Sequence, residues 1–86
     1  MKGLTEMNEI EKAVYEFIRE RFEIGEDPEY TAEVDIFDYG FVDSMGAFEI
    51  IDFAERTWSI TVDQRDLVLY PMNSVKEIAA VVAKKL

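Results

Sequence analysis

The chain has 86 residues, 49% of them apolar, and carries a net charge of −10 at pH 7. It contains no cysteine and no histidine, which excludes disulfide bonds, Cys/His zinc sites, cysteine nucleophiles and any serine–histidine catalytic pair. The length allows one domain, spanning residues 1–86, with a modest core. We therefore expect a protein that is not an enzyme and has no catalytic residues of its own.

The negative charge is concentrated in the middle of the chain. Between Arg21 and Arg56 there is no lysine or arginine, and every charged residue is acidic: Glu23, Glu26, Asp27, Glu29, Glu33, Asp35, Asp38, Asp43, Glu49, Asp52 and Glu55. Such a block repels nucleic acid and anionic lipid and attracts basic protein surfaces. No stretch reaches the apolar length of a signal peptide or a membrane span, so we expect a cytoplasmic protein without membrane insertion.

A first helix is predicted over residues 8–22. Asn8 followed by Glu11 is a pattern typical of a capped helix start. Apolar residues then recur at helical spacing, at Ile10, Val14, Phe17, Ile18 and Phe22. Gly25 marks the end of this helix, and Pro28 prevents its continuation.

A connection of about twenty residues, 23–42, follows the first helix, and its length is typical of a functional or poorly ordered segment. We expect four apolar residues to anchor it to the core: Tyr30, Val34, Ile36 and Phe37. Its Asp35–Gly40 stretch has the opening residue of a calcium loop. It lacks the alternating acidic ligands and the distant glutamate that such a loop needs, so we predict no metal site.

A second helix is predicted from Ser44 to about Thr57. At about 100° per residue, one face is apolar and suited to the core: Ala47, Ile50, Ile51, Ala54 and Trp58. The other face combines acids with two large apolar residues: Met45, Phe48, Glu49, Asp52 and Glu55. We predict that this face binds partners, the apolar pair as anchor and the acids for orientation. Alternatively, Met45 and Phe48 pack beneath the preceding loop.

The remaining chain predicts two more helices. Ile60 and Val62 lie in a short alternating run that we expect to be a loop closing the core. Asp63 is predicted to cap a short helix over residues 64–69, which Pro71 ends. The last helix starts at a Ser74–Glu77 capping pattern and carries Val75, Ile78, Ala79, Val82 and Leu86 at helical spacing. The fold class is therefore all-α: a four-helix bundle with a short third helix and a long first loop.

The stretch Asp38-Tyr39-Gly40-Phe41-Val42-Asp43-Ser44-Met45-Gly46 connects the long loop to the second helix. Its glycine turn would hold Ser44 at the surface, and a serine at the positive end of a helix is a favourable place for a phosphodiester. A serine or aspartate at such a position is also an ordinary helix cap. The sequence leaves both interpretations open.

This stretch resembles the phosphopantetheine attachment motif of acyl carrier proteins, and the resemblance in size, charge and helix order covers nearly the whole chain. It implies a carrier with 4′-phosphopantetheine attached covalently to Ser44, carrying an acyl or aminoacyl group as a thioester. A phosphopantetheinyl transferase would supply the group from coenzyme A with magnesium, and Asp43 would help to place that metal. The implied recognition residues are Met45, Phe48, Glu49, Asp52 and Glu55.

The resemblance also implies further partners: a ligase that loads the acyl or aminoacyl group, and acyl-using enzymes with basic surfaces. We expect the carrier to be a monomer. Two residues, Phe41 and Val42, separate the glycine from the Asp–Ser pair, where fatty-acid carriers usually have one. That form is closer to D-alanyl carriers and to stand-alone carriers of specialised lipid or polyketide pathways.

The size of Phe53 and Trp58 predicts a narrow bundle interior that limits how deeply an acyl chain is sheltered. The alternative function is a small acidic helical module for protein–protein interaction. In that alternative, Ser44 serves only as a helix cap.

Overall fold

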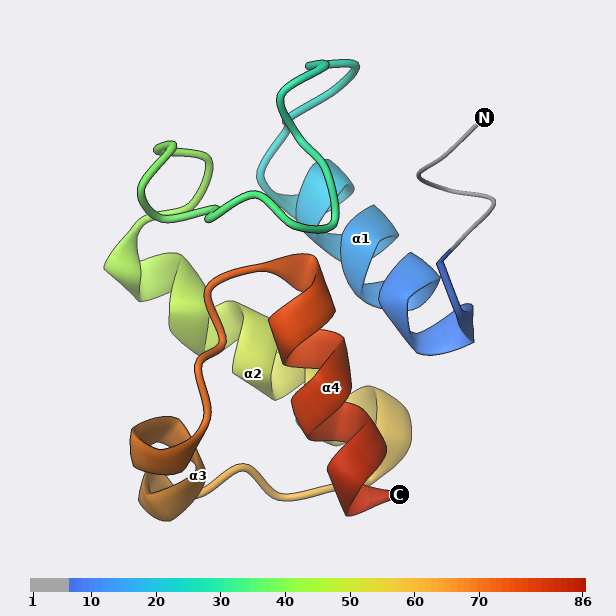
Figure 1. Ribbon diagram of the computed structural model, residues 1–86, viewed down its shortest axis with the longest axis vertical. Coiled ribbons are helices and arrows are strands. Elements are labelled where there is room, and N and C mark those ends of the chain that lie inside the picture. Colours follow the sequence, from blue (N-terminus) through green and yellow to red (C-terminus); the bar gives the residue numbers. More distant parts are fainter. Residues whose placement is uncertain (1–6) are drawn as a thin grey trace.

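A computed structural model describes residues 7–86, which form four helices and no strand (Figure 1). The helices are α1 (Glu9–Arg21), α2 (Ser44–Trp58), α3 (Gln64–Leu69) and α4 (Val75–Lys85). The predicted all-helical class, the helix order and the short third helix are confirmed. Across these residues, no helix combines the length and the apolar character needed to cross a membrane.

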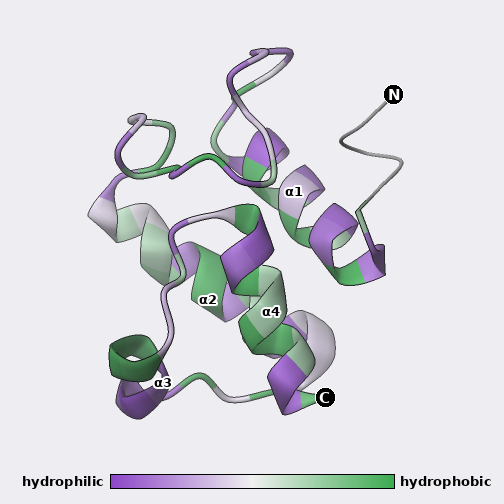
Figure 2. Cartoon of the chain, in the orientation of Figure 1, coloured by the Kyte–Doolittle hydropathy of each residue, from purple (hydrophilic) through white to green (hydrophobic). Residues whose placement is uncertain are grey.

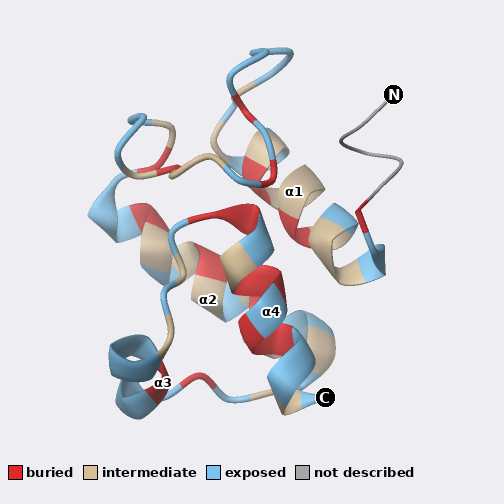
Figure 3. Cartoon of the chain, viewed as in Figure 1, coloured by how far each residue is buried: buried red, intermediate tan, exposed pale blue. Residues whose placement is uncertain are grey.

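Helices α1, α2 and α4 enclose the core, and α1 packs mainly against α4 and more sparsely against α2. The largest fully buried side chains on these helices are Val14, Ile18, Ile50, Val75, Ile78 and Val82. Burying each such side chain stabilises the fold by about 1.5–3 kcal/mol. Figure 3 shows the buried residues gathered where the three helices face one another. The predicted apolar stripe fails at Leu86, which follows the end of α4 and is 69% exposed.

The helix caps follow the predicted patterns with one difference. The Asn8 side chain accepts the backbone N–H of Glu11 at 2.8 Å, and the Glu11 carboxylate accepts that of Asn8 at 3.0 Å. At α4 the Ser74 hydroxyl accepts the N–H of Glu77 at 3.1 Å. The Glu77 carboxylate, however, accepts the N–H of Asn73 at 2.9 Å, one residue before the cap. The predicted box is therefore only half formed.

The long connection, residues 23–42, is tied to the start of α4. Tyr30 and Ile36 are buried, as predicted, and the N–H of Ile36 donates to the Asn73 carbonyl at 2.9 Å. In return, the N–H of Lys76 donates to the carbonyl of Ala32 at 2.9 Å. The first N–H groups of a helix have no partner within the helix, so the loop supplies an acceptor that α4 lacks. The connection is a structural part of the bundle.

A pair of tyrosines joins the same loop to α1. The rings of Tyr15 and Tyr30 stack with centroids 4.4 Å apart and an interplanar angle of 20°. The Tyr30 hydroxyl donates to the Tyr15 carbonyl at 2.9 Å, and the Tyr15 hydroxyl donates to the Tyr30 carbonyl at 3.4 Å. Burial raises the pKa of both hydroxyls above the usual tyrosine value. Both hydroxyls therefore stay protonated and able to donate to a higher pH than an exposed tyrosine would.

Helix α3 buries an acid and exposes apolar side chains. Asp66 is 9% exposed, and its Oδ2 accepts the Lys85 ammonium at 2.7 Å and the N–H of Asp63 at 3.0 Å. Leu67 and Val68 are exposed, and Figure 2 shows one turn of α3 coloured hydrophobic and the other hydrophilic. The Lys85 ammonium holds the pKa of the Asp66 carboxyl below its ordinary value. The ion pair thus links α3 to the end of α4.

Acid should weaken this link. Because the pKa of Asp66 is lowered on folding, its contribution is present above the unfolded pKa of about 3.9 and is lost as pH falls through the folded value. Lys85→Gln removes much of that contribution. We expect the difference in free energy of unfolding between wild type and Lys85→Gln, measured in urea, to shrink as pH falls below about 4. A difference that stays constant down to about pH 2 would show that the pair does not stabilise the fold.

Candidate functional site

Ser44 is the first residue of α2 and is exposed, at the end of a tight turn. The N–H of Gly40 donates to the Phe37 carbonyl, and the N–H of Val42 donates to the Ile36 carbonyl, both at 3.1 Å. Gly40 has a φ of +81°, a left-handed conformation that glycine adopts without a steric penalty. The predicted glycine turn is confirmed, and it delivers Ser44 to the surface.

The two residues between Gly40 and the Asp–Ser pair have separate structural roles. Val42 is 3% exposed and belongs to the core. Phe41 stacks on Tyr39 with centroids 5.6 Å apart, and meets the edge of Tyr30 at the same distance. The longer spacing therefore places one side chain in the core and the other in a row of aromatic rings on the loop.

The N-cap of α2 is Asp43, and the hypothesis that Ser44 serves only as a cap is wrong. Asp43 has the extended backbone of a cap, and its Oδ1 accepts the N–H of Gly46 at 2.9 Å. Aspartate caps as well as serine, and here it stands one residue earlier. Within residues 7–86 the Ser44 hydroxyl makes no hydrogen bond. It is an exposed group without a structural task there.

The start of α2 favours a negative charge at Ser44. The backbone N–H groups of Ser44 and Met45 are in the first turn, where a helix provides no internal acceptor. The aligned peptides of a 15-residue helix add positive potential at this end. A phosphate ester on the Ser44 hydroxyl would lie beside both. This position therefore suits an anion carried by the serine.

Gly46 fixes the first turn of α2 against the end of α1. A Cβ atom at this position would lie 2.5 Å from Cγ1 of Val42 and 2.7 Å from Cε1 of Phe22. Heavy atoms cannot approach so closely, so only glycine fits here without displacement of its neighbours. Phe22 caps the end of α1. This contact therefore fixes the position of the first turn of α2, which begins at Ser44, against the end of α1.

The apolar residues of the predicted recognition face are accessible. Met45 is 70% exposed and Phe48 is 68% exposed. The alternative in which they pack beneath the loop is therefore wrong. They follow Ser44 by one and four residues on the same helix, so a protein that covers Ser44 can also reach them.

The acids of the predicted recognition face are each engaged within the chain. Glu49 forms an ion pair with Arg21 of α1, and Asp52 forms one with Arg56 at 3.1 Å. The Glu55 carboxylate accepts the N–H of Val62 at 2.8 Å. Glu55 therefore supports the loop after α2, a role that depends on tertiary contacts and that its helical position does not indicate.

The carboxylate of Asp35 also has a local structural role. Its Oδ1 accepts the N–H groups of Phe37 and Asp38, at 3.0 and 2.9 Å. These bonds shape the turn before Ser44. Among residues 7–86 there is no group of three or more acids arranged to hold a metal ion.

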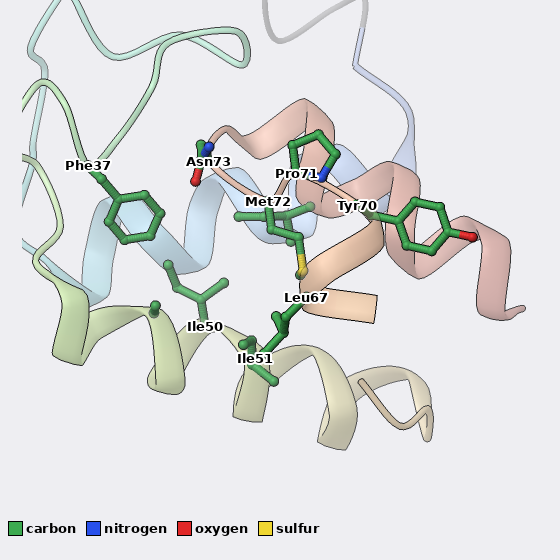
Figure 4. A pocket seen from close by; sticks show the side chains of 10 residues that line it. Phe37, Ile50, Ile51, Leu67, Tyr70, Pro71, Met72 and Asn73 are labelled. Atoms are coloured by element: carbon green, nitrogen blue, oxygen red, sulfur yellow. The ribbon is translucent and has the colours of Figure 1, made fainter. Parts of the chain in front are cut away.

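A cavity of about 250 Å³ lies on the core-facing side of α2. Its apolar lining includes Phe37, Ile50, Ile51, Leu67, Met72 and Ile78. Figure 4 shows Met72 above Ile50 and Ile51, with Phe37 near one end and Tyr70 turned outward at the other. The lining begins at Ala47, about 5 Å along the helix from Ser44 at 1.5 Å per residue.

Phe53 and Trp58 do not line this cavity, and their predicted effect on how deeply an acyl chain is sheltered stays a prediction. Phe53 stacks on Phe17 of α1 with ring centroids 4.1 Å apart, and Trp58 meets the edge of Phe53 at 5.7 Å. The Phe53 ring therefore faces α1, and Trp58 is half-buried against the core. Helical periodicity placed Trp58 on the core face but could not show which neighbour it would contact.

Comparisons with protein-family models, with curated proteins and with solved structures find no match to this chain.

Gly46→Ala should destabilise the protein. Glycine to alanine inside a helix usually stabilises it by up to about 1 kcal/mol. Here the added methyl group would overlap Val42 and Phe22, and overpacking of this kind costs about 1–3 kcal/mol. Urea unfolding measures the loss. In the Val42→Ala background the same change should cost less; a Gly46→Ala protein as stable as wild type would show that the contact is not restrictive.

Single substitutions at Asp43 and Ser44 should distinguish the residue that caps α2 from the residue whose hydroxyl has no structural partner. We expect Asp43→Ala to lower the free energy of unfolding by about 1 kcal/mol, since it removes the acceptor for Gly46. Asp43→Asn keeps a capping side chain and should stay near wild type. Ser44→Ala should change stability by less than about 0.5 kcal/mol, as an exposed residue without a partner. A larger loss for Ser44→Ala than for Asp43→Ala would contradict this assignment.

Proposed function

We propose that this chain is a carrier of the acyl carrier type, in which 4′-phosphopantetheine is attached to Ser44. One observation carries the proposal: the Ser44 hydroxyl is exposed and unbonded at the start of α2, while Asp43 provides the cap. If the Ser44 side chain capped the helix, its modification would remove the cap and lower the stability of the fold. This serine is free to accept a substituent.

The surroundings of Ser44 fit a phosphodiester. The free N–H groups of the first turn and the helix dipole favour its negative charge. Gly46 and the turn at Gly40 hold the serine outside the bundle, where a transferase can reach it. Once attached, the group supplies a long flexible arm whose thiol holds an acyl or aminoacyl group as a thioester.

The two carboxylate oxygens of Asp43 have different roles in this proposal. One carboxylate oxygen caps α2 through Gly46. The second oxygen faces no hydrogen-bond donor within residues 7–86, and Asp43 is exposed. That oxygen could coordinate the magnesium ion that the transferase uses. The cap fixes the carboxylate of the residue that directly precedes the reacting serine.

The cavity beside α2 favours an apolar acyl cargo over an aminoacyl group. Its lining is mainly aliphatic and aromatic, and burying the ammonium group of an amino acid there would be costly. Its volume of about 250 Å³ exceeds the roughly 150 Å³ of a cavity that binds benzene. A short to medium apolar chain fits this space, as a specialised lipid or polyketide pathway would supply. A D-alanyl group would remain outside.

Met45 and Phe48 supply the contact surface for the transferase, the loading ligase and acyl-using enzymes. Exposed large apolar side chains next to a reactive residue are typical anchors of a protein interface. The net charge of −10 favours partners with basic surfaces and opposes self-association.

A second candidate is a small interaction module that binds through Met45 and Phe48 alone. The exposure of these two residues supports the interaction module as much as the carrier, because it does not depend on Ser44. The two functions differ in whether Ser44 is modified. The test is therefore chemical.

We expect a broad-specificity phosphopantetheinyl transferase with magnesium to label the chain from a fluorescent coenzyme A analogue. Ser44→Ala should abolish the in-gel fluorescence while retaining the circular dichroism of wild type. The control is Ser59→Gly, which removes an exposed hydroxyl from a residue at φ +54° that glycine tolerates, and it should label fully. Equal labelling of Ser44→Ala, or no labelling of folded wild type, would refute the proposal.

A further inference from the structure

A groove of about 470 Å³ is lined by residues of α1 and α2, on a different face of α2 from the apolar cavity. Its floor is aromatic, since Phe17 of α1 and Phe53 of α2 stack face to face within it. Phe48 forms one wall and is 68% exposed. The groove starts one helical turn beyond Ser44. Any protein that reaches Ser44 along this side of α2 must cover it.

Two ion pairs form the polar rim of the groove. Arg21, the last residue of α1, pairs with Glu49, and Arg56 pairs with Asp52 one helical turn before it. The side chains remain accessible, with 51% exposure for Arg21 and 79% for Arg56. These four charges cancel. The rim is therefore locally neutral on a chain whose net charge is −10.

The two arginines of the rim have a distinctive position in the sequence. Arg21 and Arg56 are the two basic residues that border the acid-only interval of the sequence. Both fold back onto acids of that interval, from opposite ends of it. No other lysine or arginine lies between them in sequence to compete for those acids. Glu49 and Asp52, two of the acids that could attract a basic partner, are thus already paired within the chain itself.

We infer that Arg21 and Arg56 are specificity-determining residues that mask Glu49 and Asp52 from basic partner surfaces. The occupant of the groove is a partner protein that presents an arginine or lysine next to an apolar side chain. The apolar group inserts beside Phe48, and the basic group displaces Arg21 or Arg56. This inference rests on the proposed function only for the identity of one partner, the transferase.

The physical basis is exchange of one exposed ion pair for another. Exposed pairs are weak, so a partner can displace them at low cost. A partner that offers only positive charge gains little, because each acid it binds first loses an internal arginine. A partner that also fills the groove gains apolar burial in addition. The mask therefore selects against surfaces that are merely basic.

The test uses Arg21→Gln and Arg56→Gln, with Arg65→Gln as the matched control. Arg65 is exposed on α3, makes no ion pair among residues 7–86, and its replacement changes the net charge by the same amount. Two probes are used: the rate of loading by a broad-specificity phosphopantetheinyl transferase, and the binding of a synthetic helical peptide with leucine and arginine on one face. Fluorescence anisotropy of the labelled peptide gives the dissociation constant.

We expect each groove variant to raise the loading rate and the peptide affinity about two- to fivefold at about 0.01 M salt. The gain should disappear at about 1 M salt, where charges are screened within about 3 Å. Arg65→Gln should stay within experimental error of wild type. Phe48→Ala should weaken the peptide about fivefold or more in every background.

An unchanged or lower affinity in the groove variants would overturn the inference, and so would an equal gain in Arg65→Gln, which would point to net charge alone. Peptide binding that is insensitive to Phe48→Ala would place the peptide elsewhere and also overturn it. If the transferase fails to load wild type, the proposed function fails and the peptide still tests the mask. If loading succeeds and neither probe responds to the arginines, only the mask fails.

Discussion

The close approach of Gly46 to Phe22 and Val42 is the contact on which the rest of the site depends. It brings the first turn of α2 against the end of α1, at distances that leave no room for a Cβ atom. Because α2 starts there, Ser44 projects outward from the bundle. Because α1 ends there, Arg21 lies beside α2 and can reach Glu49. One backbone contact thus places both the exposed serine and one of the charges that flank the aromatic groove.

Around that contact the chain separates structural tasks from chemical ones. Asp43 caps α2, and the long loop supplies hydrogen bonds to α4 and a tyrosine to α1. Glu55 holds the loop after α2. Because these residues make the structural contacts, the Ser44 hydroxyl has no structural role among residues 7–86. A residue that the fold does not use is one that a modifying enzyme can change without unfolding the protein, and the proposed carrier function requires this freedom.

Local patterns predicted most of the fold. Helix bounds, the cap at Asn8 and the core positions of α1 and α4 follow from periodicity and short-range hydrogen bonding, which are encoded within a few residues. The site was harder to predict where the answer depends on residues distant in sequence. Sequence alone could not choose between Asp43 and Ser44 as the cap, because both residues cap well. Nor could it show that Arg21 would neutralise Glu49, or that α3 would bury Asp66, since both depend on tertiary packing.

The most direct test of the account is residue-resolved mass spectrometry of the chain after co-expression with a broad-specificity phosphopantetheinyl transferase. Fragment masses show which side chain bears an added group. We predict a gain of one phosphopantetheine on the intact chain, with fragments that place it on Ser44. A folded chain of unmodified mass, or a group located on Ser59 or Ser74, would contradict the claim that the start of α2 is built as an attachment point.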